Sequence, residues 1–518
     1  MRLPALMSAL LVAVALAVSP SSPASAATPV AGPQAVEIAA GDGTRLAANV
    51  IAPRASGTYP LIVFIASWGL NDAEYLAQAA RLATGGYVVV SYTPRGFWLS
   101  GGDIDTAGPR DVADLSTVLD WALAHTAADP SKVGVGGVSY GAGIGLIGAA
   151  FDPRIRAVTA LSGWTDLVYS LYGNDTRHLQ STLFLQLAAQ LLGSPGPELS
   201  GVLADFFANR DVPAIKAWGR TRSAASYLDL INVHRPAVLI ANAWSDTFFP
   251  PNQLTAFYTG LTGPKRLELA PGDHAVAEAG GLLGLPNPVW TSVSRWFDHH
   301  LRGVANGIDA EPPVRVRPWN GPAEGYADWA DLTGSVRRYP LGAIRPLDGT
   351  GLLGDPATTA WSKPVPLGLD TTANGGIALI SNGLSAITGV QQSVWLPSVS
   401  RLRAGVWASS RPAVPVKVRG VPRVHLDLES APAHGTLVAY LYDLDLAGTA
   451  KLITHAPVSW SASTGAVDVD LHATSYDVPA GHSLTLVVDS EDPLYLDANT
   501  LGTSVSLGAG SYLDLPVM

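Results

Sequence analysis

The sequence contains no cysteine in its 518 residues. Disulfides, metal–thiolate sites and cysteine nucleophiles are therefore excluded, so the stability of the fold has to come from buried apolar surface. Charged residues are also scarce at 14%, whereas 47% of the residues are hydrophobic. A chain of this length and composition predicts two or three domains with large cores rather than a disordered protein.

Basic residues are too few and too scattered to form a basic face. Lys and Arg number 32 against 42 Asp and Glu, and the formal net charge is −10. Because binding to DNA or RNA requires a cluster of cations that displaces counterions, this balance argues against a nucleic-acid partner.

Long apolar runs are missing except near the N-terminus. Residues 3–18 are largely apolar, follow Arg2 and lead into a Ser/Pro-rich passage that ends in Ala-Ser-Ala at 24–26. This order is typical of a secretory signal peptide. Because the apolar run is shorter than the roughly 20 residues that span a bilayer, we expect cleavage after Ala26 and an exported protein without stable membrane insertion.

Residues 27–308 alternate short apolar runs with helical patterns. Such alternation predicts an α/β domain with a mostly parallel sheet covered by helices. An antiparallel edge hairpin is expected at 35–51, around a Gly-Asp-Gly turn. The other expected strands are residues 61–65, 87–92, 133–137, 157–161, 237–242 and 266–269, and helices are expected at 109–125 and 288–301.

Two segments depart from this alternation. Residues 164–233 carry helix-like apolar stretches between two sheet strands, which predicts a helical cap over the active site; the alternative is that these helices belong to the core. Residues 309–518 show period-two alternation, beginning at 314–317, and this predicts an all-β sandwich or jelly roll of antiparallel strands. Within it, residues 341–384 are rich in Gly, Pro and Thr and are expected to form long loops.

The motif Gly-Val-Ser-Tyr-Gly at 137–141 stands between a predicted strand and a small-residue helix. Gly-x-Ser-x-Gly in this setting is a nucleophile elbow: a strained turn lifts the serine hydroxyl clear of the backbone, and the glycines avoid clashes with strand and helix. The helix N-terminus also favours negative charge that develops beside it. We therefore predict that Ser139 is the catalytic nucleophile of a hydrolase.

A serine nucleophile requires a base and an acid that orients the base. Of the 11 histidines, His274 lies just after an expected strand, residues 266–269. Asp246 lies just after another expected strand, residues 237–242. Catalytic groups gather beyond strand C-termini in open α/β sheets, and a carboxylate there would fix the imidazole tautomer. The order Ser139, Asp246, His274 is the one used by α/β-hydrolases. Asp273, next to the base, is the rival for the acid.

The tetrahedral intermediate of such a reaction needs hydrogen-bond donors for its oxyanion. The backbone N–H of Tyr140, which follows the nucleophile, is one. The second should come from the loop at 66–70, where Trp68 or Gly69 is the candidate. No cofactor and no metal is expected to take part.

Several further motifs accompany the elbow. They are Thr-Pro-Arg-Gly at 93–96, Trp-Ser-Asp at 244–246, Gly-Asp-His at 272–274 and Arg-Trp-Phe-Asp-His-His-Leu at 295–301. With them the sequence resembles the Xaa-Pro dipeptidyl-peptidase and cocaine-esterase family of α/β-hydrolases over nearly all of the mature chain. The resemblance implies hydrolysis of an ester or amide through an acyl-enzyme, with the cap and a C-terminal jelly roll shaping the acyl pocket.

The sequence departs from the family at one place. Cocaine-esterase-like members use a Tyr hydroxyl after the early strand to complete the oxyanion hole, and the best alignment puts Trp68 there. An indole N–H is a donor. Our hypothesis is therefore that Trp68 donates through either its ring N–H or its backbone N–H.

These features together predict a secreted serine hydrolase of carboxylesterase type that acts on a small-molecule ester or amide or on a peptide. The first alternative is an Xaa-Pro dipeptidyl-peptidase, which would need cap carboxylates to hold a free ammonium. The second is a non-catalytic protein that binds a surface partner. The oligomeric state is left open. A dipeptidyl-peptidase could use any of five carboxylates of the predicted cap, and the alternative is that these are surface charges. They are Asp166, Glu198, Asp205, Asp211 and Asp229.

Overall fold

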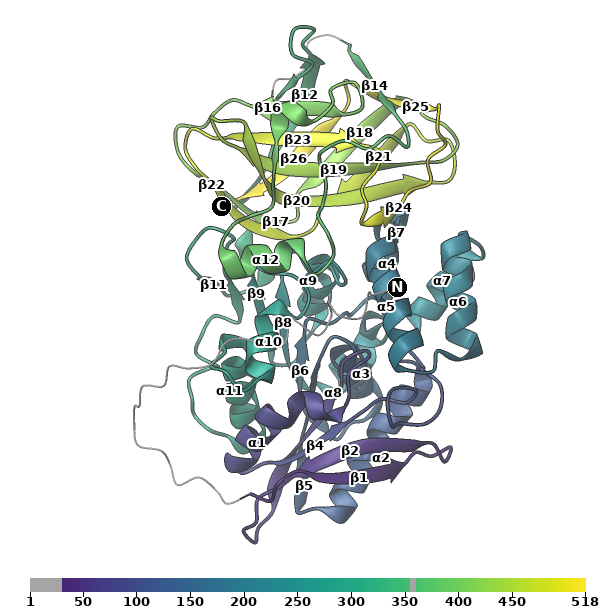
Figure 1. Cartoon of the computed structure of the whole chain (residues 1–518). Helices are drawn as coiled ribbons and strands as arrows, with labels where there is room; N and C mark the ends of the chain where they lie inside the picture. The colour runs from purple at the N-terminus through teal and green to yellow at the C-terminus, as the bar shows by residue number, and fades with distance from the viewer. Residues whose placement is uncertain (1–29, 355–359) are drawn as a thin grey trace.

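The computed structural model describes residues 30–354 and 360–518. An α/β domain is followed along the chain by an all-β domain (Figure 1), as the sequence predicts. The predicted signal peptide, residues 1–26, lies outside the described residues. Within the described ranges no helix is long and apolar enough to cross a membrane.

The α/β domain is built on one sheet with strand order β1-β2-β4-β3-β5-β6-β8-β9-β10-β11. Neighbours from β4 to β10 are parallel, while antiparallel strands lie at both edges. The strands are β1 (Gln34–Ala39), β2 (Arg45–Ile51), β3 (Tyr59–Ile65), β4 (Val88–Tyr92), β5 (Ala128–Val138), β6 (Ile155–Leu161), β8 (Ala237–Ala243), β9 (Lys265–Ala270), β10 (Val314–Val316) and β11 (Glu324–Tyr326).

Helices cover both faces of this sheet because its central strands are apolar on both sides. Phe64 of β3 points to one face and packs on Trp290, whereas Val63 points to the other and joins the core with Leu115 and Ile144. The first face carries α1 (Leu76–Thr84) and α11 (Pro288–Arg302), and α10 (Val276–Leu282) packs on both of these helices; the second carries α2 (Pro109–His125), α3 (Tyr140–Phe151), α8 (Leu228–His234) and α9 (Pro251–Gly260).

The segment between β6 and β8 is helical, as expected for a cap, and stands on the side where the two domains meet (Figure 1). Its elements are α4 (Leu167–Tyr172), β7 (Arg177–His178), α5 (Leu179–Leu192), α6 (Gly196–Ala208) and α7 (Val212–Arg220). The same segment also contains the short 3-10 turns η2 (Gly173–Asp175) and η3 (Ala224–Tyr227) and ends in α8. The other 3-10 turns of the described residues are η1 (Asp72–Tyr75), η4 (Trp329–Leu332) and η5 (Leu396–Ser398).

The all-β domain is a sandwich of mostly antiparallel strands. Apolar side chains of β18, β19, β23 and β26 form one shared core between the two layers. The strands are β12 (Ser335–Ile344), β13 (Gly351–Leu353), β14 (Ser362–Pro366), β15 (Ser393–Trp395), β16 (Gly405–Ser409), β17 (Val416–Gly420), β18 (Arg423–Ser430), β19 (Gly435–Leu444), β20 (Thr449–Trp460), β21 (Ala466–Asp470), β22 (Thr474–Val478), β23 (Ser483–Asp489), β24 (Tyr495–Leu496), β25 (Ser504–Gly508) and β26 (Tyr512–Val517).

Two expectations for the C-terminal half are wrong. The alternating residues 314–317 do not begin the antiparallel sandwich: Val314–Val316 is β10, which pairs in parallel with β9 and extends the α/β sheet. Residues 341–384 are not all loop, because they include β13, β14 and the start of α12 (Ser381–Thr388). Strands of three to five residues between Gly and Pro leave too little periodic signal to be recognised.

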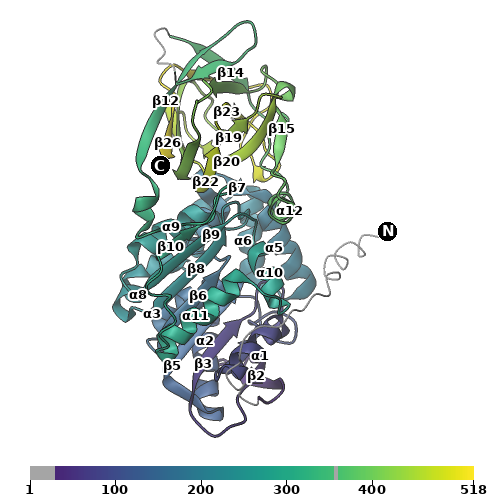
Figure 2. The same cartoon turned by 90° about the vertical axis from the view of Figure 1, so that its left-hand side faces the viewer.

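The all-β domain packs against the cap and the carboxyl end of the sheet (Figure 2). β24 pairs with β7, which places Tyr495 opposite His178. The Asn252 side chain donates to the carbonyl of Leu471 at 2.9 Å and accepts from the N–H of Ala473 at 2.7 Å. The C-terminal domain therefore lies close to the loops that follow β8 and β9.

Candidate active site

Ser139 occupies the turn between β5 and α3. Its backbone has φ 57° and ψ −112°, a strained conformation of the kind found at functional turns. A Cβ at Gly137 would lie 2.8 Å from the carbonyl oxygen of Ile65, and a Cβ at Gly141 would overlap the same atom. Only glycine fits at both positions, so the local sequence builds the tight turn that the elbow motif predicts.

The three residues predicted as the triad lie together in one chain of hydrogen bonds. His274 Nε2 is 2.9 Å from Ser139 Oγ, and His274 Nδ1 is 3.0 Å from Asp246 Oδ2. The other oxygen of Asp246 accepts the backbone N–H groups of Phe248 and Phe249 at 2.9 and 2.8 Å. Both phenylalanine rings also contact the imidazole, so the acid and the base are held in fixed orientations.

The electrostatics of this chain favour a charged imidazole. Burial alone would lower the pKa of His274, but the adjacent Asp246 carboxylate outweighs burial and raises it. Asp246 is 1% exposed, so little solvent screens its attraction for the imidazolium. The arrangement can take a proton from Ser139 and stabilise the charge that results.

Asp273, the rival acid, has a different set of partners. Its Oδ1 accepts hydrogen bonds from the N–H and the hydroxyl of Thr247 and from the backbone N–H of His274, each at 2.8 Å. Burial and the neighbouring Asp246 raise the pKa of Asp273 to about 6. Asp273 thus ties the loops after β8 and β9 together, whereas Asp246 contacts the ring.

The candidate oxyanion donors are main-chain groups. Tyr140 is the first residue of α3, where a backbone N–H has no acceptor within the helix. The indole N–H of Trp68 donates to the carbonyl of Leu185 on α5 at 2.9 Å, so in this structure the ring N–H is already engaged. The backbone N–H of Trp68 has no acceptor among the described residues. The backbone N–H groups of Tyr140, Trp68 and Gly69 therefore stay the candidates for the oxyanion hole.

Two sequence models of one family match the chain. The model of the X-Pro dipeptidyl-peptidase (S15 family) covers residues 42–276, and that of the X-Pro dipeptidyl-peptidase C-terminal non-catalytic domain covers 306–511. The chain belongs to this family. It is accordingly a hydrolase of serine type, which contradicts the alternative of a non-catalytic binding protein.

Solved structures of related hydrolases share the whole fold. A CocE/NonD family hydrolase from Staphylococcus aureus superposes with a TM-score of 0.72 at 13% identity, covering 94% of each chain. An α-amino acid ester hydrolase gives 0.73 at 15% identity and covers 96% of this chain and 98% of that one. Acyltransferase drtE of Aspergillus calidoustus is 24% identical over 226 residues, which are 38% of this chain and 72% of its own.

The hydrolase links its oxyanion loop to its elbow through a buried acid that the sequence did not reveal. Glu74 in η1 accepts the N–H of Ser67 at 2.7 Å, and its other oxygen lies 2.7 Å from Ser67 Oγ. The same hydroxyl lies 3.0 Å from the carbonyl of Val138, the residue before Ser139. The only sequence signal was a pair of acids, Asp72 and Glu74, shortly after a strand.

Glu74 is best satisfied in its neutral form. Ser67 Oγ carries one proton and cannot donate to both a carboxylate and the Val138 carbonyl. A protonated Glu74 donates to Ser67 Oγ, which then donates to Val138, so every group has a partner. Burial raises the pKa of Glu74 to about 7, although the hydrogen bonds from Ser67 act to lower this pKa. The carboxyl thus ties Ser67, the residue before Trp68, to Val138, the residue before Ser139.

A pocket opens beside Ser139 between the sheet and the cap of the hydrolase. Its catalytic end is formed by Ser139, Tyr140, Trp164 and Phe249, with Trp68 and Thr106 beside them, and helices α4 to α7 form the rest. In the described part of the chain, none of its lining residues bears a carboxylate. The lining residues from the cap are Leu167, Val168, Leu171, Tyr172, Thr182, Leu185, Gln186, Leu199, Val202, Leu203, Phe206, Ile215, Lys216, Trp218 and Gly219.

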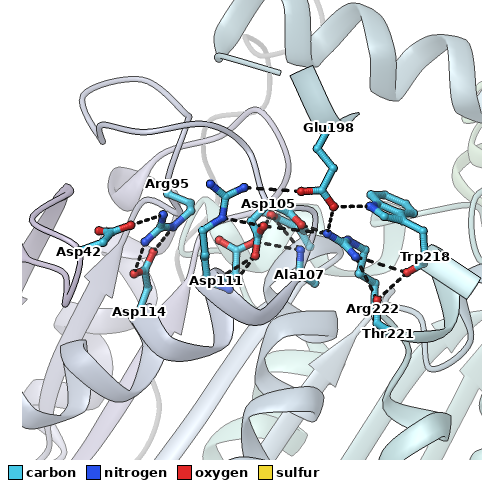
Figure 3. A network of polar contacts seen from close by, with 12 residues as sticks. Asp42, Arg95, Asp105, Ala107, Asp111, Asp114, Glu198, Trp218, Thr221 and Arg222 are labelled. Atoms are coloured by element: carbon cyan, nitrogen blue, oxygen red, sulfur yellow. Dashed lines mark hydrogen bonds and ion pairs between the residues drawn. The ribbon is translucent and has the colours of Figure 1, made fainter. Parts of the chain in front are cut away.

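A polar network fastens the cap to the α/β domain beside this pocket (Figure 3). Glu198 on α6 accepts hydrogen bonds from Arg222 and from the indole N–H of Trp218, both at 2.8 Å, and lies 3.9 Å from Arg110 on α2. Arg222 donates to the carbonyl of Asp105 at 3.2 Å, and its guanidinium stacks 4.0 Å from the Trp218 ring. Because Trp218 lines the pocket, the network holds one wall in place.

Arg95, the arginine of the Thr-Pro-Arg-Gly motif, is also drawn in Figure 3. Arg95 is 2% exposed and forms a two-pronged ion pair with Asp114, at 2.7 Å for each bond, and a bond of 2.9 Å to Asp42. These contacts join the β1–β2 turn to α2. The motif therefore supports the frame of the site and does not reach the pocket.

The carboxylates considered for an ammonium site lie elsewhere in the cap. Asp166 caps α4 by accepting the N–H of Tyr169. Asp205 pairs with its neighbour along the chain, Arg210, and Asp211 and Asp229 are exposed. Like Glu198, none of them lines the pocket beside Ser139.

Proposed function

We propose that the hydrolase cleaves esters through an acyl-enzyme on Ser139, with His274 as general base and acid and Asp246 as the residue that orients the imidazole. The observation that carries the proposal is the continuous hydrogen-bonded chain from Ser139 Oγ through both ring nitrogens of His274 to Asp246 Oδ2, at 2.9 and 3.0 Å. Nucleophile, base and orienting acid within hydrogen-bond reach are what this chemistry requires.

In the acylation half, Ser139 Oγ bonds to the ester carbonyl carbon while its proton passes to His274 Nε2. The carbonyl oxygen becomes an oxyanion, and the backbone N–H groups of Tyr140 and Trp68 supply hydrogen bonds to it. As the intermediate collapses, the bond to the leaving oxygen breaks and His274 returns the proton to that oxygen. The alcohol leaves and the acyl group stays on Ser139.

In the deacylation half, water takes the place of the alcohol. It gives a proton to His274 Nε2 as its oxygen bonds to the acyl carbon, and the second oxyanion uses the same two N–H groups. The carbon–Oγ bond then breaks, and Ser139 recovers its proton from His274. The products are a carboxylic acid and free enzyme, and Asp246 stabilises the imidazolium without accepting its proton.

A fluorophosphonate probe tests this assignment. It should label the wild type at Ser139, as peptide mass spectrometry would show, and should fail to label Ser139→Ala. A folded Ser139→Gly variant, which has no side chain at the elbow, is a second negative control. It should also fail to react with the probe. Labelling at another residue, or no labelling of the folded wild type, overturns the assignment.

We also propose that the protein is exported and that residues 1–26 are removed. The charged start, the short apolar run and the Ala-Ser-Ala site support this proposal. N-terminal sequencing of protein recovered outside the producing cell should begin at Ala27. An intact N-terminus on cytoplasmic protein would overturn it.

A further inference from the structure

We propose that the pocket beside Ser139 accepts a neutral, apolar acyl chain of medium length and rejects acyl groups that carry an α-ammonium. This inference rests on the proposed function, because it names the acyl group that Ser139 would receive. It separates an ester hydrolase from a dipeptidyl-peptidase within the same fold.

The shape of the pocket suits a chain rather than a small group. From Ser139 the pocket extends among helices α4, α5, α6 and α7. Its cavity volume for water-sized groups is about 90 Å3, which leaves room for a thin chain rather than a bulky group. The rings of Trp164 and Phe249 contact each other in a tilted arrangement at the catalytic end, with centroids 5.0 Å apart. Tyr172 and Phe206 form a second aromatic pair within the cap.

The lining offers almost nothing polar to an acyl group. Apart from the catalytic end, the side chains are mainly Leu, Val, Ile and aromatic residues of the cap, including Leu199 and Phe206, which are each 5% exposed. An apolar chain placed there loses no hydrogen bonds and removes apolar surface from water. A charged group would lose its hydration without gaining a partner.

The one charged lining residue has the wrong sign for an ammonium. Lys216 Nζ bonds to Asp175 at 2.5 Å and lies 4.8 Å from the centre of the Tyr172 ring. Asp175 does not line the pocket, so it neutralises the lysine from outside. A substrate ammonium inside the pocket would meet a cation and find no free carboxylate.

Glu198 is an acid bonded to a residue of the pocket wall, and its Oε1 already has two partners. It bonds to Arg222 and to the indole N–H of Trp218, with Arg110 also close (Figure 3). Both hydrogen bonds end on Oε1, and Oε2 lies 3.9 Å from Arg110, so guanidinium groups already balance the charge of Glu198. Glu198 is half-exposed to solvent and does not line the pocket, so it offers no carboxylate to an ammonium inside.

The test compares two substrates that differ in a single group. The p-nitrophenyl esters of octanoic acid and of 2-aminooctanoic acid share the same chain, and only the second carries an α-ammonium. We expect kcat/KM to be at least tenfold higher for the octanoate after subtraction of spontaneous hydrolysis. We also expect it to rise at least tenfold from butanoate to octanoate, because each buried methylene contributes several-fold.

A pair of variants on one helix links this preference to the pocket. Val202→Trp on α6 places a large side chain in the lining, and it should lower the octanoate-to-acetate ratio of kcat/KM at least tenfold. Ala204→Trp is the matched control, because Ala204 is exposed on the same helix and does not line the pocket. This control should keep the wild-type ratio.

Three outcomes would overturn the inference. They are an equal or higher kcat/KM for the 2-aminooctanoate or for Gly-Pro p-nitroanilide, a flat chain-length profile, and a better rate with the mono-p-nitrophenyl ester of adipic acid, which would indicate an anionic acyl group. If the wild type reacts with the fluorophosphonate and shows one of these results, the inference fails while the acyl-enzyme proposal stands. If the folded wild type neither reacts with the probe nor cleaves any ester, the proposed function itself fails.

Discussion

Histidine is buried in two regions of this hydrolase with opposite consequences for its charge. In the candidate active site, His274 contacts the Asp246 carboxylate and its pKa is raised in spite of burial. Where the two domains meet, burial lowers the pKa of His178 and His455 to about 3 and that of His472 well below its usual value. The difference shows that the carboxylate partner, and not burial, decides whether a buried imidazole can hold a proton.

The two environments suit different tasks. His274 can exchange a proton during a reaction because Asp246 stabilises its charged form. The three interface rings form no hydrogen bond to a carboxylate within the described residues, and Nε2 of His455 lies 2.9 Å from the Tyr495 hydroxyl, at hydrogen-bond distance. As neutral groups they can pack between the domains.

The largest effect is expected when the active-site histidine loses its acid. Asp246→Asn keeps the size of the side chain but removes the charge that holds the imidazole in the required tautomer. We expect kcat/KM on a p-nitrophenyl ester to fall by about 10⁴. Steady-state kinetics on protein with an unchanged thermal melting curve measures this loss.

Asp273→Asn is the matched control for that substitution. Asp273 is a buried acid beside the same histidine, but its hydrogen-bond partners are Thr247 and a backbone N–H. We expect its loss of kcat/KM to stay within about tenfold. If Asp273→Asn were as damaging as Asp246→Asn, the choice of Asp246 as the orienting acid would be wrong.

Glu74 extends the comparison of buried groups to an acid whose hydrogen-bond partner is Ser67 rather than a histidine. Glu74→Ala removes the link between Ser67 and the elbow and should lower kcat by about 10- to 100-fold, since the Trp68 N–H loses its support. Glu74→Gln reproduces the neutral carboxyl, because its amide donates to Ser67 Oγ and its oxygen accepts the Ser67 N–H. It should stay within about threefold of the wild type.

The affinity of a boronic acid, which mimics the tetrahedral intermediate, distinguishes positioning from general destabilisation. Glu74→Ala should bind it more weakly in proportion to the fall in kcat, with little change in KM. Equal activity of the Ala and Gln variants would show that the carboxyl does not position the oxyanion loop.

Much of the fold, and the residues of the candidate site, could be predicted because both depend on local sequence. A buried parallel strand is a short apolar run, and the residue after it lies at the edge where side chains from neighbouring strands meet. Ser139, Asp246 and His274 each follow such a run, so chain positions alone bring them to one edge. The glycines at 137 and 141 mark the turn, because the turn leaves no room for a Cβ atom at either position.

The features that sequence reasoning missed depend on contacts between distant segments. Whether the Trp68 indole is free depends on Leu185, which lies 117 positions away on a cap helix. β10 was misassigned because a half-exposed parallel strand alternates like an antiparallel one; its middle residue, Arg315, is exposed while Val314 and Val316 are buried. Glu74 reads as a surface charge until Ser67 and Val138 enclose it.

The interface histidines should make the protein sensitive to acid. In the unfolded chain a histidine binds a proton below about pH 6.5, whereas His178 and His455 stay neutral in the fold down to about pH 3. The unfolded state therefore binds more protons between these values, and stability falls as pH decreases from about 6.5 to 3. Each such histidine contributes about 1.4 kcal/mol per pH unit of this loss.

Thermal melting between pH 7 and pH 4 measures this dependence. His455→Gln removes one titrating group while keeping a polar side chain beside Tyr495, and the decrease in Tm on acidification should become smaller. His434→Gln is the control, because His434 is exposed, and its pH profile should match the wild type. A His455→Gln profile that ran parallel to the wild type would contradict the assignment of acid sensitivity to this interface.

The smallest effect is expected at Glu198, a half-exposed acid whose partners are guanidinium groups. Glu198→Gln keeps an acceptor for Arg222 and Trp218 but removes the charge, and solvent screens ion pairs at such a site. Because Trp218 lines the pocket, a looser wall should raise KM for the octanoate ester about two- to threefold at low salt, with kcat unchanged. Screening should remove this difference near 0.5 M salt, since the Debye length then falls to a few ångströms, about the distance between the paired charges. A loss in kcat, or a change in KM that persists at high salt, would mean that Glu198 acts through the shape of the pocket and not through its charge.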